Sequence, residues 1–322
     1  MKLIFRTLAL AAGLAFAAHA SAQGYPNKPV RIVVAYQAGQ GTDVATRFLA
    51  DRLGKALGQN FFIENKPGAG GNIGAAEVAR AAPDGYTLLQ GTNGTHGINQ
   101  ALYAKPGFDA LKDFTPIARW TVIPALLVVN PSVPASNVKE LIAFIKANPG
   151  KVSFASAGNG TTSHLAGVMF KNATGTDIVH VPYKGGGPAL AGLLGGDVQL
   201  MIDLMVSVYP NAKAGKIRGL GVTTLQRVST APELPTLDET GLPGFQIAAS
   251  DGVYAPAGTP RAIVDKLNAA FKQALEDPKV RENLMSRGAF PMPGPADDLA
   301  KHVTAEYAMW IKLVNESGAK VD

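Results

Sequence analysis

Short apolar runs alternate with amphipathic stretches along most of the chain. Residues 30–36 (VRIVVAY) are rich in β-branched side chains, which predicts a buried strand. From Thr42 to Leu57 the apolar residues recur on one helical face, and Thr42 is placed to cap the start of a helix. This strand–loop–helix order repeats along the chain, and it is typical of mainly parallel sheets covered by helices.

The same two periodicities place the remaining elements. Further strands are predicted at residues 61–64, 86–89, 125–129, 152–155, 178–181, 198–203, 217–223 and 245–255. Further helices are predicted at residues 72–81, 137–147, about 162–172, 188–194, 261–275, 278–286 and 296–314. The expected fold class is therefore α/β, with mixed, mostly parallel sheets flanked by helices.

Two similar α/β units follow one another, at roughly 24–123 and 124–248, and a mainly helical segment completes the chain. That segment has little sheet of its own, so we expect it to pack on the first unit. The expected organisation is a discontinuous domain of residues 23–123 plus 249–322, and a second domain of residues 124–248. Chain crossings near 123 and 249 then form a hinge, and a ligand binds in the cleft at the carboxyl ends of the strands.

The first residues have the pattern of an export signal. Lys2 and Arg6 precede an apolar stretch at residues 8–18, and Ala20-Ser21-Ala22 forms a small-residue cleavage site. We expect cleavage after Ala22 and export to the periplasm. No later run of 18 apolar residues occurs, so no membrane span is predicted.

Composition narrows the function classes. The 322 residues include no cysteine, which excludes disulfides, zinc fingers, iron–sulfur clusters and cysteine nucleophiles. The formal net charge of +6 comes without a Lys/Arg block, so no nucleic-acid partner is expected. The histidines are not paired at helical spacing, and neither G-x-S-x-G nor G-x-x-x-x-G-K-[ST] occurs. We therefore expect no metal, no cofactor and no catalytic residue.

Three glycine-rich loops, at residues 37–42, 91–95 and 156–162, each follow a predicted strand and precede a helix. Backbone N–H groups at a helix start favour anions, and the threonines and serines of these loops add hydroxyl donors. One such loop alone is more often an ordinary turn. Because three such loops face one predicted cleft, the interpretation as ordinary turns and the interpretation as an anion-binding site are about equally favoured.

Other polar features leave alternatives open. His164 either lines the cleft or makes a structural hydrogen bond, and the structural role is favoured. Asp203, at a strand end, bonds a ligand ammonium, bonds a loop N–H or caps the next helix, and a structural role is again favoured. Asp43 is expected to stabilise the start of its helix. Residues 68–74 fit G-x-G-x-x-x-G, a weak dinucleotide pattern that keeps a nucleotide-cofactor enzyme as a minor alternative.

Several motifs together resemble one known family. They are YQAGQGTD at 36–43, ENKPGAGGNIG at 64–74, APDGYTL at 82–88, ASAGNGTTSHLA at 155–166, VHVPYKG at 179–185, LLGGD at 193–197 and APAGTP at 255–260. In this order they resemble the Bug family, the periplasmic solute-binding receptors of tripartite tricarboxylate transporters. The resemblance covers nearly the whole chain after the N-terminal signal.

The resemblance implies a monomeric, two-domain Venus-flytrap receptor that is not an enzyme. Such a receptor delivers a di-, tri- or aromatic carboxylate to two integral membrane transporter subunits; a sensor that presents the ligand to a signalling partner is the alternative. The ligand-binding residues expected here are Tyr36, Gln37, Ala38, Gly39, Gln40, Thr42, Thr92, Asn93, Ser156, Ala157, Asn159, Thr161, Thr162, His164, Tyr183, Asp203, Ser250 and Asp251.

Some positions depart from the family pattern. Gln40 stands where relatives often have glycine, and Gln37 replaces a small or apolar residue. Ser250 and Asp251 stand where relatives often carry aromatic residues, and Leu204 follows Asp203 in place of asparagine. An aspartate at 251 would repel a second carboxylate, or accept a hydrogen bond from an ammonium or a hydroxyl group.

Overall fold

The computed structural model describes residues 24–39, 41–286 and 288–321. The predicted export signal of residues 1–22 lies outside these ranges, together with its cleavage site. Within the ranges, no helix is both long enough and apolar enough to cross a membrane.

A mixed sheet runs through the molecule. Its strand order is β2-β1-β3-β9-β4-β7-β5-β6, with β8 and β10 also paired to β4. The strands are β1 (Val30–Val34), β2 (Phe61–Asn65), β3 (Thr87–Thr92), β4 (Phe114–Val129), β5 (Val152–Ser156), β6 (Ile178–Pro182), β7 (Leu200–Leu204), β8 (Arg218–Val222), β9 (Ala248–Pro256) and β10 (Phe290–Pro291). The pairs β1–β2, β1–β3, β5–β6 and β5–β7 are parallel.

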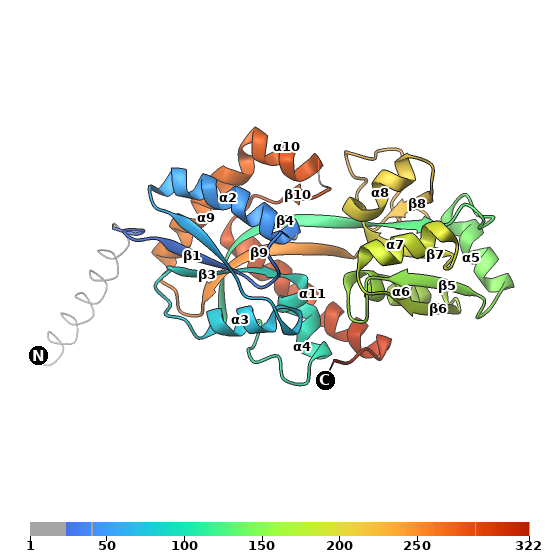
Figure 1. The fold of residues 1–322 in the computed structure, drawn as a ribbon, viewed down its shortest axis with the longest axis horizontal. Helices are drawn as coiled ribbons and strands as arrows, with labels where there is room; N and C mark the ends of the chain where they lie inside the picture. Colours follow the sequence, from blue (N-terminus) through green and yellow to red (C-terminus); the bar gives the residue numbers. More distant parts are fainter. Residues whose placement is uncertain (1–23, 40, 287, 322) are drawn as a thin grey trace, which may run out of the picture.

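The long strand β4 joins two halves of this sheet. It runs antiparallel to β9 from the pair Phe114–Pro256 to the pair Pro124–Ala248. Its C-terminal end then runs antiparallel to β7 and β8. Figure 1 shows two lobes, with β4 and β9 side by side between them.

Helices cover the sheet in both lobes (Figure 1). The first lobe carries α2 (Gly41–Leu57), the turn η1 (Ala69–Gly71), α3 (Asn72–Ala79), the π-helical turn η2 (Gly94–Ile98), α4 (Asn99–Leu102), α9 (Arg261–Glu276) and α10 (Pro278–Ser286). The second lobe carries α5 (Val138–Ala147), α6 (Thr162–Thr174), α7 (Gly186–Gly195) and α8 (Met205–Lys213). The last helix, α11 (Ala296–Ser317), packs against β4, η2 and α6.

The C-terminal helix therefore touches both lobes, where the sequence predicted packing on one. Trp310 of α11 is buried in the same apolar cluster as Phe170 of α6. At the solvent side, Asn172 Nδ2 donates a hydrogen bond to Glu316 Oε2 at 2.7 Å. Sequence periodicity shows that α11 has an apolar face, but it does not show that two partners share this face.

The alternation of strands and helices agrees with the sequence prediction, but parallel pairs do not predominate. The strand predicted at 125–129 is the end of β4, whose neighbours β7, β8, β9 and β10 all run antiparallel to it. Pro116 and Pro124 hid the first part of this strand, because proline normally interrupts a sheet. Here the β4–β9 register shifts next to Pro116, and such irregularities are where sheets tolerate proline.

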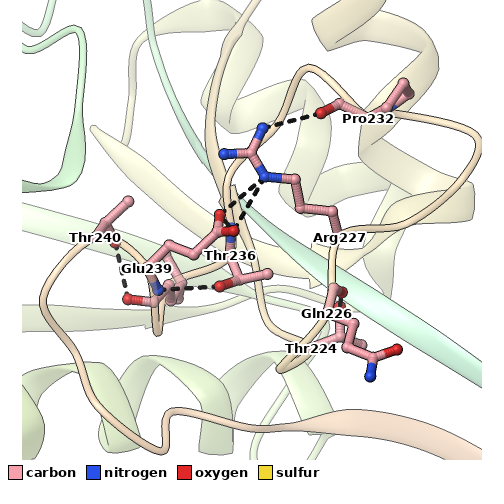
Figure 2. Close-up of polar contacts among 8 residues, drawn as sticks. Thr224, Gln226, Arg227, Pro232, Thr236, Glu239 and Thr240 are labelled. Carbon is pink, nitrogen blue, oxygen red and sulfur yellow. Dashed lines mark hydrogen bonds and ion pairs between the residues drawn. The ribbon is translucent and has the colours of Figure 1, made fainter.

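Polar contacts help to order the chain between β8 and β9 (Figure 2). Arg227 Nε donates to Glu239 Oε2 at 2.9 Å, and Arg227 Nη1 donates to the Pro232 carbonyl at 3.1 Å. The Glu239 amide donates to Thr236 Oγ1 at 3.0 Å while the Thr236 amide donates to Glu239 Oε2 at 2.9 Å. This reciprocal pair has the form of a capping box and orders the chain before it returns along β9.

Candidate functional site

A cavity of about 390 Å³ lies where the two lobes meet. Its lining comes from both lobes and from the crossing strands: Tyr36, Thr42, Gly70, Thr92, Asn93, Gly94, Ile98, Asn99, Leu102, Tyr103, Ile123, Asn159, Gly160, Thr161, Thr162, Leu204, Ala249, Asp251 and Val321. Most of the polar members follow strands or begin helices, and Ile98, Leu102 and Val321 form an apolar part. This volume is typical of a site for a small molecule.

The loop after β1 is fixed by the carboxylate of Asp43, in the first turn of α2. Its Oδ2 accepts from the Gly39 amide at 2.8 Å, and its Oδ1 accepts from Asn65 Nδ2 at 2.9 Å and pairs with Arg47. Burial raises the pKa of Asp43, but hydrogen bonds from Arg47, Gly39 and Asn65 outweigh burial and hold the pKa below its usual value. Asp43 thus stabilises the helix start, as expected, and also sets the loop.

Replacement of Asp43 should destabilise the protein. We expect Asp43→Ala to lower the free energy of unfolding by about 2–4 kcal/mol, because it removes a buried carboxylate that three donors share. A carboxyl with a lowered pKa contributes stability above its unfolded-state pKa, so the deficit should narrow as the pH falls below about 4. Thermal melts at pH 7 and pH 3.5 measure this. Asp51→Ala, on the exposed side of the same helix, is the control and should change the free energy of unfolding much less. Equal losses in the two variants would contradict the role of Asp43.

The second loop begins where β3 ends. Tyr36 Oη and Thr92 Oγ1 lie 2.7 Å apart, which ties the first loop to the second. Thr92 Oγ1 also accepts from the Gly94 amide at 3.1 Å, at the start of the π-helical turn η2. Burial raises the pKa of Tyr36 to about 12, so its hydroxyl stays neutral and can donate.

The third loop leads from β5 into α6. Thr161 caps this helix, because its Oγ1 accepts from the His164 amide at 3.4 Å, and the same hydroxyl donates to the Gly158 carbonyl at 2.7 Å. His164 Nδ1 accepts from the Gly160 amide at 3.1 Å. Burial, together with the neighbouring His180, lowers the pKa of His164 to about 4, so the ring is neutral at pH 7 and can accept this bond.

Two contacts join the lobes across the cavity. Asn93 Nδ2 in the first lobe donates to Thr162 Oγ1 in the second at 3.1 Å. Gly160 lies against Leu102 of α4 so closely that a Cβ at position 160 would overlap the leucine side chain. Gly160 also has φ +72°, a left-handed conformation that glycine adopts without strain.

Asp251 reaches the cavity from the crossing strand β9. Its Oδ2 accepts from Thr121 Oγ1 at 3.0 Å, and its Oδ1 accepts from Gln90 Nε2 at 3.3 Å. Burial raises its pKa to about 6, and these two neutral donors only partly offset burial. At pH 7 the cavity therefore contains a carboxylate that is mostly ionised and poorly solvated.

The burial of this charge should cost stability. A carboxyl with a raised pKa contributes most stability below its unfolded-state pKa and loses it as the pH rises through about 6. We therefore expect Asp251→Asn to raise the melting temperature of the ligand-free protein by several degrees at pH 7.5 and by less at pH 4.5. The new amide can donate to Gln90 Oε1, which lacks a partner among the described residues. Calorimetric melts at both pH values test this, with the exposed Asp265→Asn as control; a lower melting temperature at pH 7.5 would refute it.

The structure brings eight of the expected ligand residues to the cavity: Tyr36, Thr42, Thr92, Asn93, Asn159, Thr161, Thr162 and Asp251. Thr42 does not cap its helix, because α2 already begins at Gly41. Gln40 lies outside the described residues.

Other expected residues lie away from the cavity lining. Gln37, Ala38 and Gly39 are exposed, and Ala157 is partly buried. Ser156 is fully buried, with its Oγ 2.6 Å from His180 Nε2. His164 is buried and stacks on His180 at 3.9 Å, which agrees with the structural role that the sequence favoured.

Strand alternation accounts for two further placements. Successive side chains of a strand point to opposite faces, so Asp251 and Ala249 face the cavity while Ser250 borders a separate void of about 10 Å³ beside Glu306. In the same way Leu204 lines the cavity and Asp203 points away, with its Oδ2 near Gly186. Tyr183 packs its ring against Gly192 of α7.

The apolar part of the cavity escaped sequence reasoning. Ile98, Leu102 and Tyr103 follow the second loop, and Val321 is brought alongside by a bridge between Tyr103 and Val321. Only the fold joins these segments, although the apolar residues after the second loop offered a weak signal. Among the described residues, no group of three or more His, Asp or Glu side chains could hold a metal ion.

Comparisons with known proteins yield a family and close structural neighbours. The sequence model described as the tripartite tricarboxylate transporter family receptor, TctC, matches residues 45–319. Rpa4515 from R. palustris, solved with adipate, is 38% identical with a TM-score of 0.78 over 92% of this chain and 100% of that chain. The periplasmic binding protein BugD is 38% identical with a TM-score of 0.74 over 92% and 99% of the two chains. MatC from Rhodopseudomonas palustris, solved with malate, is 37% identical with a TM-score of 0.74 over 90% and 100%.

Proposed function

Because the chain belongs to the tripartite tricarboxylate transporter receptor family, we propose that it captures a small organic carboxylate between its lobes and delivers it to a membrane transporter. Members of this family are periplasmic solute-binding receptors and not enzymes. The neighbours solved with adipate and malate support a small carboxylate as the ligand class.

One observation carries the proposal: the long helices α2 and α6, from different lobes, both begin at the cavity. The first amides of a helix have no partner within the helix, and the helix dipole adds partial positive charge there. Thr42 and Thr162 place hydroxyl groups beside these helix starts. Such donors hold a carboxylate without a fixed cation.

The two lobes act as domains that close over the ligand. We assign residues 23–123 and 249–322 to one domain and 124–248 to the other, since β4 and β9 pair up to Pro124 and Ala248 at this boundary. Flexing of these two crossing strands opens the cleft. Closure is driven by ligand contacts that exist only when both lobes meet, as they do where Asn93 donates a hydrogen bond to Thr162.

A thermal-shift and calorimetry screen tests the proposal. The panel contains dicarboxylates, tricarboxylates, aromatic acids, amino acids and nucleotides. A micromolar ligand at millimolar concentration stabilises the folded state by about 4 kcal/mol, which gives a clear shift. Thr162→Val should weaken the ligand that binds by about tenfold, and the exposed Thr304→Val should not change it. A response to nucleotides alone would refute carboxylate capture.

The cellular part of the proposal has separate tests. We propose export with cleavage after Ala22, a monomeric receptor and two integral membrane subunits as partners. N-terminal sequencing of the periplasmic protein locates the cleavage site. Light scattering of the purified receptor gives its mass, and a dimer would contradict a monomeric receptor. Reconstituted transport that requires both membrane subunits would establish the partners.

A further inference from the structure

The charges around the cavity are unequal. Among the described residues that line it, Asp251 has the one carboxylate, and no lysine, arginine or histidine is present. Tyr36 and Tyr254, whose pKa values Asp251 helps to raise, bring no charge at physiological pH, because burial raises the pKa of both hydroxyls. The carboxylate of Asp251 therefore has no countercharge within the cavity.

The hydrogen bonds of Asp251 are incomplete as well. A carboxylate offers about four acceptor positions. Thr121 and Gln90 occupy two of them, and the bond from Gln90 is long at 3.3 Å. A partly buried charge with neutral donors and free acceptor positions gains most from a ligand that brings its own cation.

We infer that Asp251 selects a zwitterionic ligand, a small carboxylate that also carries an ammonium group, and disfavours dicarboxylates. This inference rests on the proposed function and narrows its ligand class. The ligand carboxylate lies at the starts of α2 and α6, and its ammonium group lies against Asp251. Its carbon chain faces the apolar part of the cavity formed by Ile98, Leu102 and Val321.

A second carboxylate would meet Asp251 without a cation to screen it, and like charges at short range in a partly buried site repel strongly. Asp203 is the other buried acid near the second lobe's cavity wall, and its Oδ2 has no partner among the described residues. Its side chain points toward Gly186 and does not line the cavity. Asp203 is therefore a matched control for the effect of removing a buried acid.

Matched probe pairs test the inference by calorimetry. The pairs are 4-aminobutanoate with succinate, 6-aminohexanoate with adipate, and L-leucine with 4-methylpentanoate. In the wild-type protein we expect at least one amino member to bind ten times or more tightly than its partner. Asp251→Asn should reduce that ratio at least tenfold and should leave the partner's affinity unchanged or higher. Asp203→Asn should preserve the wild-type ratio.

Each outcome decides the matter. Equal or tighter binding of the partner acids in the wild type, or an unchanged ratio in Asp251→Asn, overturns the inference. If a dicarboxylate binds and Thr162→Val weakens it, the proposed function stands while this inference fails. If no carboxylate in either panel binds, both fail. Ligand-free melts confirm folding, and Asp251→Ser replaces Asp251→Asn if that variant does not fold.

Discussion

Ligand affinity is expected to fall about 100-fold in Gly160→Ala, because this substitution disturbs the contact between the lobes. A Cβ at Gly160 overlaps the side chain of Leu102, so this side chain must shift before the lobes can meet as they do here. The left-handed backbone at φ +72° adds strain for any residue with a Cβ. When the binding-competent state is rarer, the apparent dissociation constant rises in proportion. Calorimetry with the ligand found in the screen measures the change.

Two further variants separate closure from general damage. Gly187→Ala lies in α7, where an added Cβ has no neighbour within 4 Å among the described residues, so its affinity should match the wild type. Leu102→Ala removes the side chain that the new Cβ would overlap. Gly160→Ala should therefore lower the affinity less in the Leu102→Ala protein than in the wild type. Full affinity in Gly160→Ala would show that this contact plays no part in closure.

Trp310→Ala should cause the largest loss of stability, about 3–5 kcal/mol and roughly 10 °C in melting temperature. Trp310 is 1% exposed and packs beside Gly97, Ile98 and Phe170, so its removal leaves a cavity where α11 meets both lobes. Scanning calorimetry at pH 7 gives the melting temperature.

Trp310→Phe is the matched control for this prediction. It keeps most of the apolar volume and removes the indole N–H that donates to Glu306 Oε2 at 3.4 Å. We expect it to lose no more than about 2 kcal/mol. If Trp310→Ala melts within 2 °C of the wild type, the packing of Trp310 does not stabilise the contact of α11 with the two lobes.

Much of the fold could be predicted because its signals are local. The β-branched run at β1 and the amphipathic pattern of α2 mark a strand and a helix whatever surrounds them. Strand β4 was cut short because its prolines imitate a break, and α8 was missed because Pro210 lies inside it. Both errors arise where tertiary packing tolerates a residue that local preference excludes.

The part of the candidate site that lies in loops directly after strands could be predicted from the sequence. Thr92 and the loop from Asn159 to Thr162 lie at the carboxyl ends of β3 and β5, and position in the chain therefore places them near the cavity. The contribution of Val321 could not be found this way, because it depends on how the C-terminal segment packs beside Tyr103. No local pattern encodes a contact between segments so far apart.

By itself the sequence determined the order of strands and helices, the glycine-rich loops and the family motifs, since each depends on neighbouring residues. Tertiary structure alone decided which side of β9 faces the cavity. Asp251 and Ser250 are adjacent and both polar, and alternation says only that they point to opposite faces. The register of β9 between β3 and β4 turns Asp251 toward the cavity and Ser250 toward Glu306, because neighbouring strands set which face meets the other lobe.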